Sequence, residues 1–345
     1  MLSSPLVDDR ILDIAAVLAA HPVRSVEQHL GGGNNRLFHV LGADNQSYAL
    51  KEYPRRANDA RDRLDAEFAA FQFLERCGFP NVPMAIAADR AEGFALYEWI
   101  DGTPVADVAD GDVDGALAFI ARLHESRGVN GAADLALASE ACLSPMEIVA
   151  QVGRRFDSLN EVARGEPKLA GFLSQDYAPV AQAAEAWSRR GCEAHAIAFD
   201  RPIGREGQSL SPSDFGFHNA IRRPDGGLVF VDMEYFGWDD PAKLVADFLQ
   251  HPGMQLSPGQ YERFQAGALK IYGGDVTFAS RLALVYPLYG LRWCMILLNE
   301  FLPERWEARR RAGVPVDRDA ATARQLEKAR QRISIVRQYI MDHPQ

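Results

Sequence analysis

The sequence predicts an α+β fold with two lobes, residues 1–100 and residues 101–345. In the first hundred residues, short segments rich in β-branched and aromatic side chains alternate with turn sequences, and one helical segment lies among them. Beyond Asp112, hydrophobic residues recur mainly at helical spacing over several long segments. We therefore expect a small antiparallel sheet with one packed helix, followed by a mainly helical lobe.

The predicted elements of the first lobe follow one another closely. Residues 8–22 have helical spacing and end at a proline, so they predict an N-terminal helix. Three strand-like segments, separated by GGGNN and GADNQ, predict an antiparallel meander: SVEQHL, RLFHVL and SYALKEY. Residues 59–78 place four apolar side chains on one helical stripe: Leu64, Phe68, Phe71 and Leu74. Two more strand-like segments, PMAIAAD and GFALYEWI, complete this lobe.

The second lobe is predicted to be helical apart from one β region after Asp214. Amphipathic patterns cover residues 112–127, 144–164, 169–191, 240–252, 257–273 and 317–340. The most apolar stretch, residues 286–302, is interrupted by Arg292 and Glu300 and is short for a membrane span. It therefore predicts a buried helix, and we expect no membrane association.

Composition and charge limit the classes of protein. Hydrophobic residues make up 47% of the chain and charged residues 24%, as in globular proteins. The net charge of −10 argues against non-specific nucleic-acid binding, which needs a basic surface. Four widely spaced cysteines predict buried thiols in a reducing compartment: Cys77, Cys142, Cys192 and Cys294. The N-terminus lacks the pattern of a signal peptide, so we expect a soluble cytoplasmic protein of unknown oligomeric state.

The stretch SLSPSDFGFHNAI, residues 209–221, places an acid and an amide five residues apart where a loop meets a strand. Asp and Asn are common turn residues, so this pair alone also fits an ordinary turn. An acid at position 214 is well placed to accept a proton from an incoming hydroxyl group. Three histidines, His39, His124 and His218, lie on different predicted elements and indicate structural roles instead of a metal site.

The residues after this stretch predict a hairpin that would complete a metal site. Asp225-Gly226 between two β-type runs predicts a two-residue type I′ turn, whose register would place Asn219 opposite Asp232. Opposed residues on an antiparallel pair lie about 5 Å apart on one face. The Asn219 amide oxygen and the Asp232 carboxylate are therefore candidate ligands of one Mg²⁺, although a strand-end carboxylate that caps its neighbours is the alternative for Asp232.

The first lobe offers candidates for binding a phosphate chain. A glycine run between two strands provides backbone N–H groups, in residues Gly31, Gly32, Gly33, Asn34 and Asn35, although a flexible hairpin tip would look the same. Lys51 lies in the middle of a predicted strand, and Glu67 lies on or beside the apolar stripe of the following helix. A carboxylate there is costly without a partner, and Lys51 is the obvious one. Solvent-exposed positions are the alternative for both residues.

The order of these features is restrictive. A glycine loop, a strand lysine, a helix glutamate, a loop with Asp and Asn five residues apart and a strand-end Asp are the parts of a phosphoryl-transfer site, in the order found in kinases. With these motifs the chain resembles the aminoglycoside phosphotransferase and choline kinase family, small-molecule kinases with a protein-kinase-like fold. The resemblance runs from about Val26 to Asp247 and, more loosely, to about residue 300.

The resemblance implies ATP and Mg²⁺ as cofactors and roles for individual residues. GGGNNRLFHV would be the nucleotide loop, Lys51 would contact the α- and β-phosphates, and Glu67 would orient Lys51. The backbone of three hinge residues would bind adenine: Glu98, Trp99 and Ile100. Asp214 would be the catalytic base and Asn219 and Asp232 the metal ligands, with Glu234 as a further candidate for metal or substrate binding. The family usually has His-Gly before the catalytic Asp, where this chain has Pro212-Ser213.

Several alternatives stay open at this point. The departure at Pro212-Ser213 also fits a catalytically silent nucleotide-binding module, a pseudokinase, and transfer of AMP in place of phosphate would need a reversed nucleotide. ATP is not distinguished from GTP. The acceptor would be a small molecule with a hydroxyl group, such as a sugar, an amino alcohol or an aminoglycoside-like compound. Glu234, Asp239 and Glu300 would suit an amine.

Overall fold

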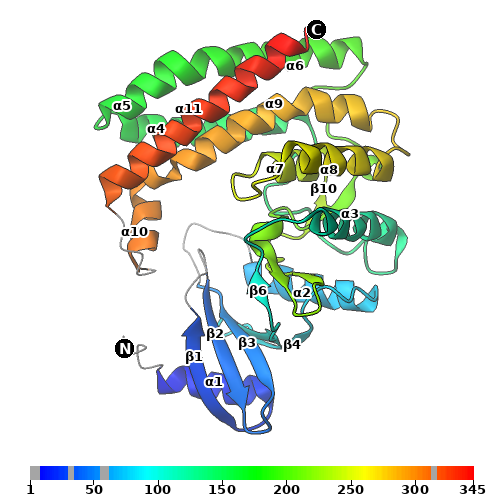
Figure 1. Cartoon of the computed structure of the whole chain (residues 1–345), viewed down its shortest axis with the longest axis vertical. Coiled ribbons are helices and arrows are strands. Elements are labelled where there is room, and N and C mark those ends of the chain that lie inside the picture. The colour runs from blue at the N-terminus through cyan, green and yellow to red at the C-terminus, as the bar shows by residue number, and fades with distance from the viewer. Residues whose placement is uncertain (1–7, 30–34, 55–61, 312–316) are drawn as a thin grey trace. The chain divides into compact units, whose positions relative to one another are not determined.

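The structure, a computed structural model, describes residues 8–29, 35–54, 62–311 and 317–345. The chain divides into two compact units. The first consists of residues 1–140 and 210–238, and the second of residues 141–209 and 239–345 (Figure 1). This division by contacts differs from the predicted division into lobes at residue 100, because residues 101–140 and the region after Asp214 belong to the first unit. The lobe boundary stays a prediction.

A five-stranded antiparallel sheet forms the frame of the first unit, as the sequence predicts. Its strands are β1 (Val23–His29), β2 (Arg36–Gly42), β3 (Ser47–Glu52), β4 (Ala85–Asp89) and β5 (Phe94–Glu98). They lie in the order β1-β2-β3-β5-β4, so the first three make the predicted meander. The predicted α+β class with a small antiparallel sheet is confirmed.

Helix α1 (Asp9–Ala19) covers one face of this sheet. The Asp8 side chain caps its first turn by accepting a hydrogen bond from the backbone N–H of Arg10. Its apolar residues pack in one cluster with alternate side chains of the strands: Ile11, Ile14, Ala15 and Leu18 with Val26, Phe38, Val40, Tyr48, Leu50, Phe94 and Leu96. Because side chains alternate along a strand, Lys51, which follows Leu50, lies on the opposite face.

Helix α2 (Arg63–Arg76) brings its apolar stripe to the first unit's core. All four predicted stripe residues are buried: Leu64, Phe68, Phe71 and Leu74. The ring of Phe71 packs edge-on against Tyr97 of β5, with 5.4 Å between centroids. Tyr97 lies opposite Ala49 of β3 and therefore on the Lys51 face of the sheet. Helix α2 thus places its buried side chains beside Lys51.

The remaining elements of the first unit are one longer helix and several short strands. Helix α3 (Asp110–Glu125) is followed by a 3₁₀ turn at Ser126–Gly128, and β6 (Thr103–Pro104), β8 (Ala220–Arg222) and β9 (Leu228–Phe230) form a three-stranded sheet. The prediction of a single β interruption after Asp214 is therefore incomplete, since β6, β7 (Ser209–Ser211) and β10 (Gly237–Asp239) are further short strands.

The hairpin after Asp214 forms, but the predicted register is wrong by one residue. Ile221 pairs with Val229, whereas a two-residue turn would have paired Arg222 with Val229. The loop is one residue longer than predicted, because the N–H of Gly226 bonds to Arg223 in a type I turn and Gly226 then takes the left-handed φ of 88°. A type I turn followed by a left-handed glycine is the usual three-residue hairpin loop.

The second unit is helical. Its helices are α4 (Pro145–Ala163), α5 (Pro167–Gly171), α6 (Ala178–Ala194), α7 (Pro241–Gln250), α8 (Pro258–Ile271), α9 (Phe278–Leu297), α10 (Pro303–Arg311) and α11 (Arg318–Asp342), with α11 lying along α9 (Figure 1). The predicted helix over residues 169–191 is interrupted by a π-helical stretch, Phe172–Tyr177. Pro179 explains the interruption, because proline offers no N–H and its ring crowds the carbonyl four residues earlier.

The apolar helix predicted near residue 290 is a core helix of the second unit. Phe278–Phe301 is longer than the sequence prediction allowed and, with a mean hydropathy of 1.3, passes for a membrane span by length and composition. However, 78% of its apolar window is buried inside the protein. Arg292 in its middle donates to Asp247, and Trp293 and Met295 are buried, as the sequence predicts.

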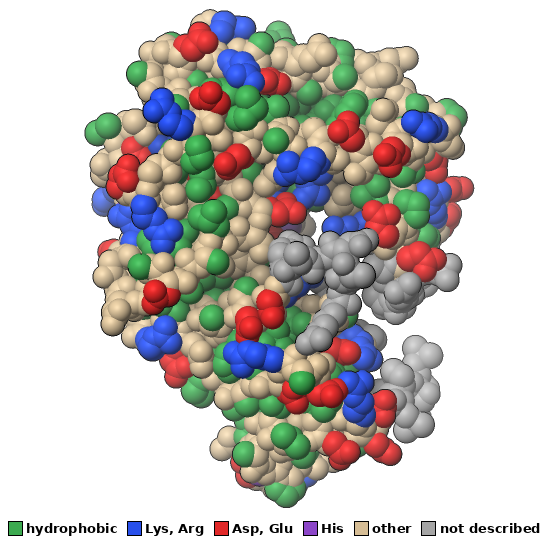
Figure 2. Space-filling model, turned by 180° about the vertical axis from the view of Figure 1, so that it is seen from behind, with side chains coloured by type: hydrophobic (Ala, Val, Ile, Leu, Met, Phe, Trp, Pro, Cys, Tyr) green, Lys and Arg blue, Asp and Glu red, His purple; other side chains and the backbone are tan. Residues whose placement is uncertain are grey.

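Charged side chains of both signs lie on the face of the protein seen in Figure 2. On the face drawn in Figure 2, Lys and Arg side chains are interspersed with Asp and Glu across both the sheet and the helices. The four cysteines are free thiols, three of them buried and Cys77 partly exposed. The predicted burial is confirmed for Cys142, Cys192 and Cys294 and is wrong for Cys77, which is only partly buried.

Candidate active site

Lys51 and Glu67 form a buried ion pair on the face of the sheet opposite α1. The Lys51 Nζ lies 2.7 Å from Glu67 Oε2, and the Glu67 side chain is 2% exposed. The hydroxyl of Tyr53 also donates to Glu67 Oε2, and the Tyr53 and Tyr97 hydroxyls lie 2.7 Å apart. Burial raises the pKa of Glu67, and the charge of Asp232 adds to this, while Lys51 opposes it. The predicted partner of Glu67 is therefore present.

Lys51 also binds Asp232, so a single ammonium group joins two carboxylates. The distance from Lys51 Nζ to Asp232 Oδ1 is 2.8 Å. Burial lowers the pKa of Lys51, but Glu67, Asp232 and Glu234 together raise it above its ordinary value. An ammonium group has three donors, and two are used here. Among the described residues this leaves one donor for a further acceptor.

The segment around Asp232 is held in an unusual backbone conformation. Asp232 has a left-handed φ of 67°, which is sparsely populated for residues other than glycine, although Asp and Asn tolerate it best. The next backbone N–H, of Met233, donates to Glu67 Oε1 at 3.1 Å. Glu67 thus binds the lysine with one oxygen and the aspartate segment with the other. This explains why a buried glutamate is needed on α2.

Glu234 is a buried anchor of this segment. Its side chain accepts a hydrogen bond of 2.7 Å from Asn35 Nδ2 and lies 3.5 Å from Arg63 Nη1. Carboxylate oxygens of Glu67, Asp232 and Glu234 lie within 4.8 Å of one another. Asn35 is the one member of the predicted nucleotide loop that the structure describes; Gly31, Gly32, Gly33 and Asn34 lie outside the described residues.

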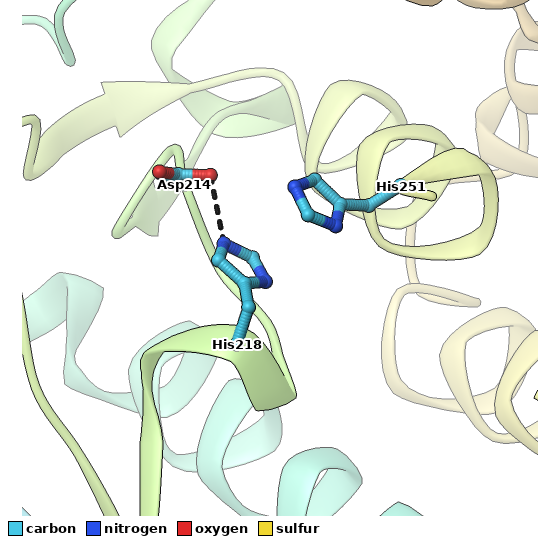
Figure 3. Close-up of side chains that lie close together, drawn as sticks. All are labelled: Asp214, His218 and His251. Carbon is cyan, nitrogen blue, oxygen red and sulfur yellow. Dashed lines mark hydrogen bonds and ion pairs between the residues drawn. The ribbon is translucent and has the colours of Figure 1, made fainter. Parts of the chain in front are cut away.

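The predicted catalytic loop is fixed by hydrogen bonds at both backbone groups of Asp214. Its N–H donates to Pro212 C=O at 2.8 Å, and Asn219 Nδ2 donates to Asp214 C=O at 2.9 Å. The Asp214 carboxylate is 43% exposed and lies 3.1 Å from His218 Nε2 (Figure 3). Because the Asn219 amide nitrogen is used inward, its Oδ1 is the atom left for a ligand.

Two aromatic side chains secure the same loop. Phe215 and Phe217 are buried on either side of Gly216. The Phe215 ring lies 4.8 Å from Phe230 and stacks 5.5 Å from Phe119 on α3. The sequence DFGFHN therefore alternates two core residues with the functional ones, which gives Asp214 and His218 fixed points of attachment.

The unusual Pro212-Ser213 pair is compatible with this loop. Ser213 has a left-handed φ of 66°, a conformation that glycine adopts without strain and serine does not. Its backbone N–H donates to Ser211 Oγ at 3.0 Å, and its own hydroxyl donates to Ser139 C=O at 3.2 Å. These bonds support the turn that a glycine would otherwise make, so the departure from the family pattern leaves the loop in order.

The predicted hinge follows β5. The N–H of Glu98 donates to Met84 C=O at 2.9 Å, which continues the β-sheet pairing to the end of the strand. The Trp99 ring packs against His39 of β2 with 4.3 Å between centroids. Ile100 is 7% exposed. The structure thus places an aromatic residue of the hinge on a strand of the sheet, which the sequence did not indicate.

Comparison with known proteins gives one family and a set of distant structural relatives. The model of the phosphotransferase enzyme family matches residues 25–279, which is most of the chain. The chain belongs to this family. A search of curated proteins finds no match.

Solved structures similar to this phosphotransferase share its fold at low sequence identity. A choline kinase from Streptococcus pneumoniae is 16% identical, with a TM-score of 0.60 over 95% of this chain and 99% of that one. A spectinomycin phosphotransferase solved with ADP and spectinomycin is 11% identical, with a TM-score of 0.66 over 97% and 99%. An ethanolamine kinase from Plasmodium vivax is 14% identical, with a TM-score of 0.55 over 89% and 82%. The predicted family, kinase-like fold and enzyme class are confirmed.

The structure brings the candidate residues of this phosphotransferase into two groups of one unit. Lys51, Glu67 and Asp232 are in direct contact, and Asp214 and Asn219 are joined within their loop. The register that suggested a shared metal is wrong, since the Asn219 C=O accepts from Val231. The left-handed turn at Asp232 breaks the strand alternation, so the argument from opposed side chains does not apply there. Asn219 and Asp232 as joint ligands therefore stay a prediction.

The donor set fits a hard divalent cation. Mg²⁺ prefers oxygen ligands and keeps water and phosphate in its shell. Asp232 binds Lys51 through Oδ1 and is 36% exposed, so Oδ2 is the oxygen left for a ligand. The Asn219 Oδ1 and Asp232 Oδ2 are the two atoms we expect to hold Mg²⁺. Glu234, engaged by Asn35 and Arg63, serves as support.

Sequence reasoning missed several residues that support the site. Tyr53 and Arg63 bind its carboxylates, Tyr97 bonds to the Tyr53 hydroxyl, and His218 binds Asp214. Tyr53 and Tyr97 share strand parity with Lys51, so alternation along β3 and β5 would have found them. Nothing in the pattern pointed to Arg63, because its contact with Glu234 joins positions 171 residues apart.

The acidic residues suggested for an amine acceptor are largely engaged elsewhere. Asp239 is fully buried and lies 3.1 Å from Lys243, so it is part of the core of the second unit. Burial raises the pKa of Asp239 to about 6, although Lys243 opposes this shift. With Glu234 also bound internally, two of the three suggested amine partners serve the fold. The structure thus lends no support to an amine acceptor from these two residues.

Proposed function

We propose that this protein is an ATP- and Mg²⁺-dependent kinase that phosphorylates a hydroxyl group of a small metabolite. The observation that carries the proposal is the contact of Lys51 with both Glu67 and Asp232, in the same unit as the Asp214–Asn219 loop. Membership of a phosphotransferase family over residues 25–279 supports it. Relatives of the same fold solved with ADP or AMP support an adenine nucleotide.

The first group of residues would bind the nucleotide. Lys51 has one donor left for a phosphate oxygen, and Glu67 fixes its direction from a buried position. The backbone of Glu98 to Ile100 would contact the base. Mg²⁺ would be held by Asn219 and Asp232, and it would neutralise charge on the phosphates. The lysine and the protein's fixed dipoles would then stabilise charge that develops on transfer.

The second group would act on the acceptor. Asp214 would accept the proton of the acceptor hydroxyl as its oxygen bonds to the γ-phosphorus and the bond from that phosphorus to the β,γ-bridging oxygen breaks. The products are the phosphorylated acceptor, ADP and one proton, which Asp214 passes to solvent. Its 43% exposed carboxylate is accessible for this step.

A catalytically silent nucleotide-binding module is the second candidate. The observation that favours it is the Pro212-Ser213 pair before Asp214. Against it, both backbone groups of Asp214 are hydrogen-bonded and the loop is secured by Ser213, so the altered pair has not disordered the base. The acceptor is proposed only as a small hydroxyl compound; the choline, ethanolamine and spectinomycin relatives are too distant to specify it.

Calorimetric titration with a non-hydrolysable ATP analogue, with and without Mg²⁺, tests the proposal. Wild type is expected to bind more tightly with Mg²⁺, and Asp232→Asn to lose most of that dependence. Asparagine is the matched change, because it tolerates the left-handed φ at this position and removes only the charge. Absence of binding to wild type in both conditions would refute the proposed function. Binding without any phosphorylated product from a broad panel of hydroxyl compounds or from water would favour the silent module.

A further inference from the structure

His218 donates a hydrogen bond to the carboxylate of Asp214. The two atoms, His218 Nε2 and Asp214 Oδ1, lie 3.1 Å apart, and Figure 3 shows the imidazole edge directed at the carboxylate. An ionised carboxylate only accepts hydrogen bonds, so Nε2 must carry the proton. The His218 side chain is 23% exposed, so this bond is partly shielded from water.

The backbone under both residues is fixed. His218 lies in the 3₁₀ turn Phe217–Asn219. The backbone N–H of Asn219 closes this turn by donating to Gly216 C=O at 3.0 Å. Phe217 before His218 is 1% exposed and anchors the turn in the core. Asp214 is held at its N–H and C=O, as described above. His218 therefore restrains rotation of the Asp214 side chain from a fixed point.

We propose that His218 is a positioning residue for Asp214, an inference that rests on the proposed function. The bond at Oδ1 fixes the direction of the carboxylate that would take the proton of the acceptor hydroxyl. A base must lie within hydrogen-bond reach of the proton that it takes, and small misplacements at a reacting group are costly. Within the loop, the histidine four residues after Asp214 supplies a side-chain donor to its carboxylate.

To position Asp214, residue 218 needs only a hydrogen-bond donor at the place of Nε2. It does not need to pass a proton through its ring. Glutamine offers an amide N–H at a similar reach, whereas leucine has a similar volume and no donor. His218→Gln and His218→Leu are therefore a matched pair that separates the hydrogen bond from the filling of space. A role in packing alone would treat the two variants alike.

The first test measures release of ADP from Mg-ATP with water as the acceptor, since the natural acceptor is unidentified. For His218→Leu we expect kcat to fall by up to about a hundredfold, as for a misplaced reacting group, with KM for Mg-ATP within twofold of wild type. His218→Gln is expected to keep at least half of the wild-type kcat. Equal kcat values for wild type and His218→Leu would overturn the proposal, and so would equal losses in the two variants.

The second test needs no turnover. A long-range ¹H–¹⁵N spectrum of the full chain labelled at histidine reports which ring nitrogen carries the proton, and the His218 signals are assigned by their absence in His218→Gln. We expect a protonated Nε2 in wild type and a change in the His218 signals in Asp214→Ala. An unprotonated Nε2 in wild type, or signals unmoved by Asp214→Ala, would overturn the proposal. The same sample is also titrated with Mg-ATP. If the proposed function is wrong, no binding is seen in that titration. The spectrum still shows whether His218 donates a hydrogen bond to Asp214.

Discussion

At the scale of single residues, the site depends on charges that are buried only because they are paired. Lys51 is 13% exposed and Glu67 2%, and neither group would be stable there alone. Removing one partner of a buried pair leaves an uncompensated charge, which costs more than the pair itself contributes. The ion pair is thus both a functional arrangement and a point of weakness in the fold.

Lys51→Met is therefore expected to lower the free energy of unfolding by about 3–5 kcal/mol near neutral pH. The pKa of Glu67 is already raised by burial, and loss of Lys51 raises it further. A carboxyl group whose pKa is higher in the folded than in the unfolded state destabilises the fold most at high pH, where it is ionised in both states. This cost disappears at low pH, where the group is protonated in both states. The deficit should consequently shrink as pH falls through the folded pKa. Urea unfolding of the variant at pH 5 and pH 8 measures this.

Lys51→Met/Glu67→Gln is the control for that experiment. The double variant removes the buried carboxylate together with the lysine, so it should regain much of the stability at pH 8 while still lacking the lysine for phosphate. Equal stability of the single and double variants at pH 8 would contradict the account of a buried, uncompensated Glu67.

At the scale of elements, the sequence predicted the strands and helices, which have a periodic pattern. It did not predict the features that depend on the backbone angles of single residues. The order and type of the five sheet strands follow from alternation and turn residues, and the α2 stripe from helical spacing. The predicted hairpin register was wrong because the dipeptide Asp225-Gly226 is compatible with two loops. It can form a two-residue turn, as predicted, or the last two residues of a three-residue loop, as the structure has it. The left-handed angles at Ser213 and Asp232 have no pattern in the sequence.

The candidate site shows the same division. Lys51, Glu67 and Asp214 could be named from their order along the chain, because phosphoryl transfer needs those groups in that sequence of elements. Glu234 was placed near the metal, but its buried contacts with Asn35 and Arg63 are long-range and became visible only in the structure. Contacts between side chains far apart in sequence leave no periodic signal.

Helix α7 contains a second buried charge that makes an element-scale prediction. Lys243 is fully buried and lies 3.1 Å from Asp239 and 3.4 Å from Asp247, while Arg292 also binds Asp247. Lys243→Met should cost about 3–5 kcal/mol, since Asp239 is left buried without its nearest cation. The pKa of Asp239 is raised to about 6 even with Lys243 present. Loss of the lysine raises this pKa above 6, so the variant should be least stable at pH values above the raised pKa and regain stability as the pH falls through it.

Circular dichroism during urea unfolding at pH 5 and pH 8 measures that difference. Lys243→Met/Asp239→Asn is the matched control, because it removes the charge that the single variant leaves behind. A single variant with the same stability at both pH values would show that Asp239 is not the source of the cost.

At the scale of the whole molecule, the site is assembled from parts that are distant in the sequence. Lys51 and Glu67 come from the start of the chain, and Asp214, Asn219 and Asp232 from residues 210–238, which belong to the same unit. The chain leaves this unit after residue 140 and returns at residue 210. A fragment ending at residue 140 would therefore lack every proposed metal ligand.

Binding at such a site should stabilise the first unit specifically. A ligand that binds the folded state alone adds about 2.7 kcal/mol when present at one hundred times its Kd. Mg-ADP at that excess is thus expected to raise the unfolding temperature of the intact protein, and ADP with EDTA to raise it much less. Scanning calorimetry measures both, with Asp232→Asn as the variant in which the two conditions should converge.

Hydrogen exchange then locates the effect: slower exchange should appear in β3, α2 and residues 210–238, since those segments carry the contacts of Lys51, Glu67 and Asp232. Equal protection of α4 and α6, which contribute none of the proposed nucleotide or metal ligands, would show that the nucleotide acts elsewhere.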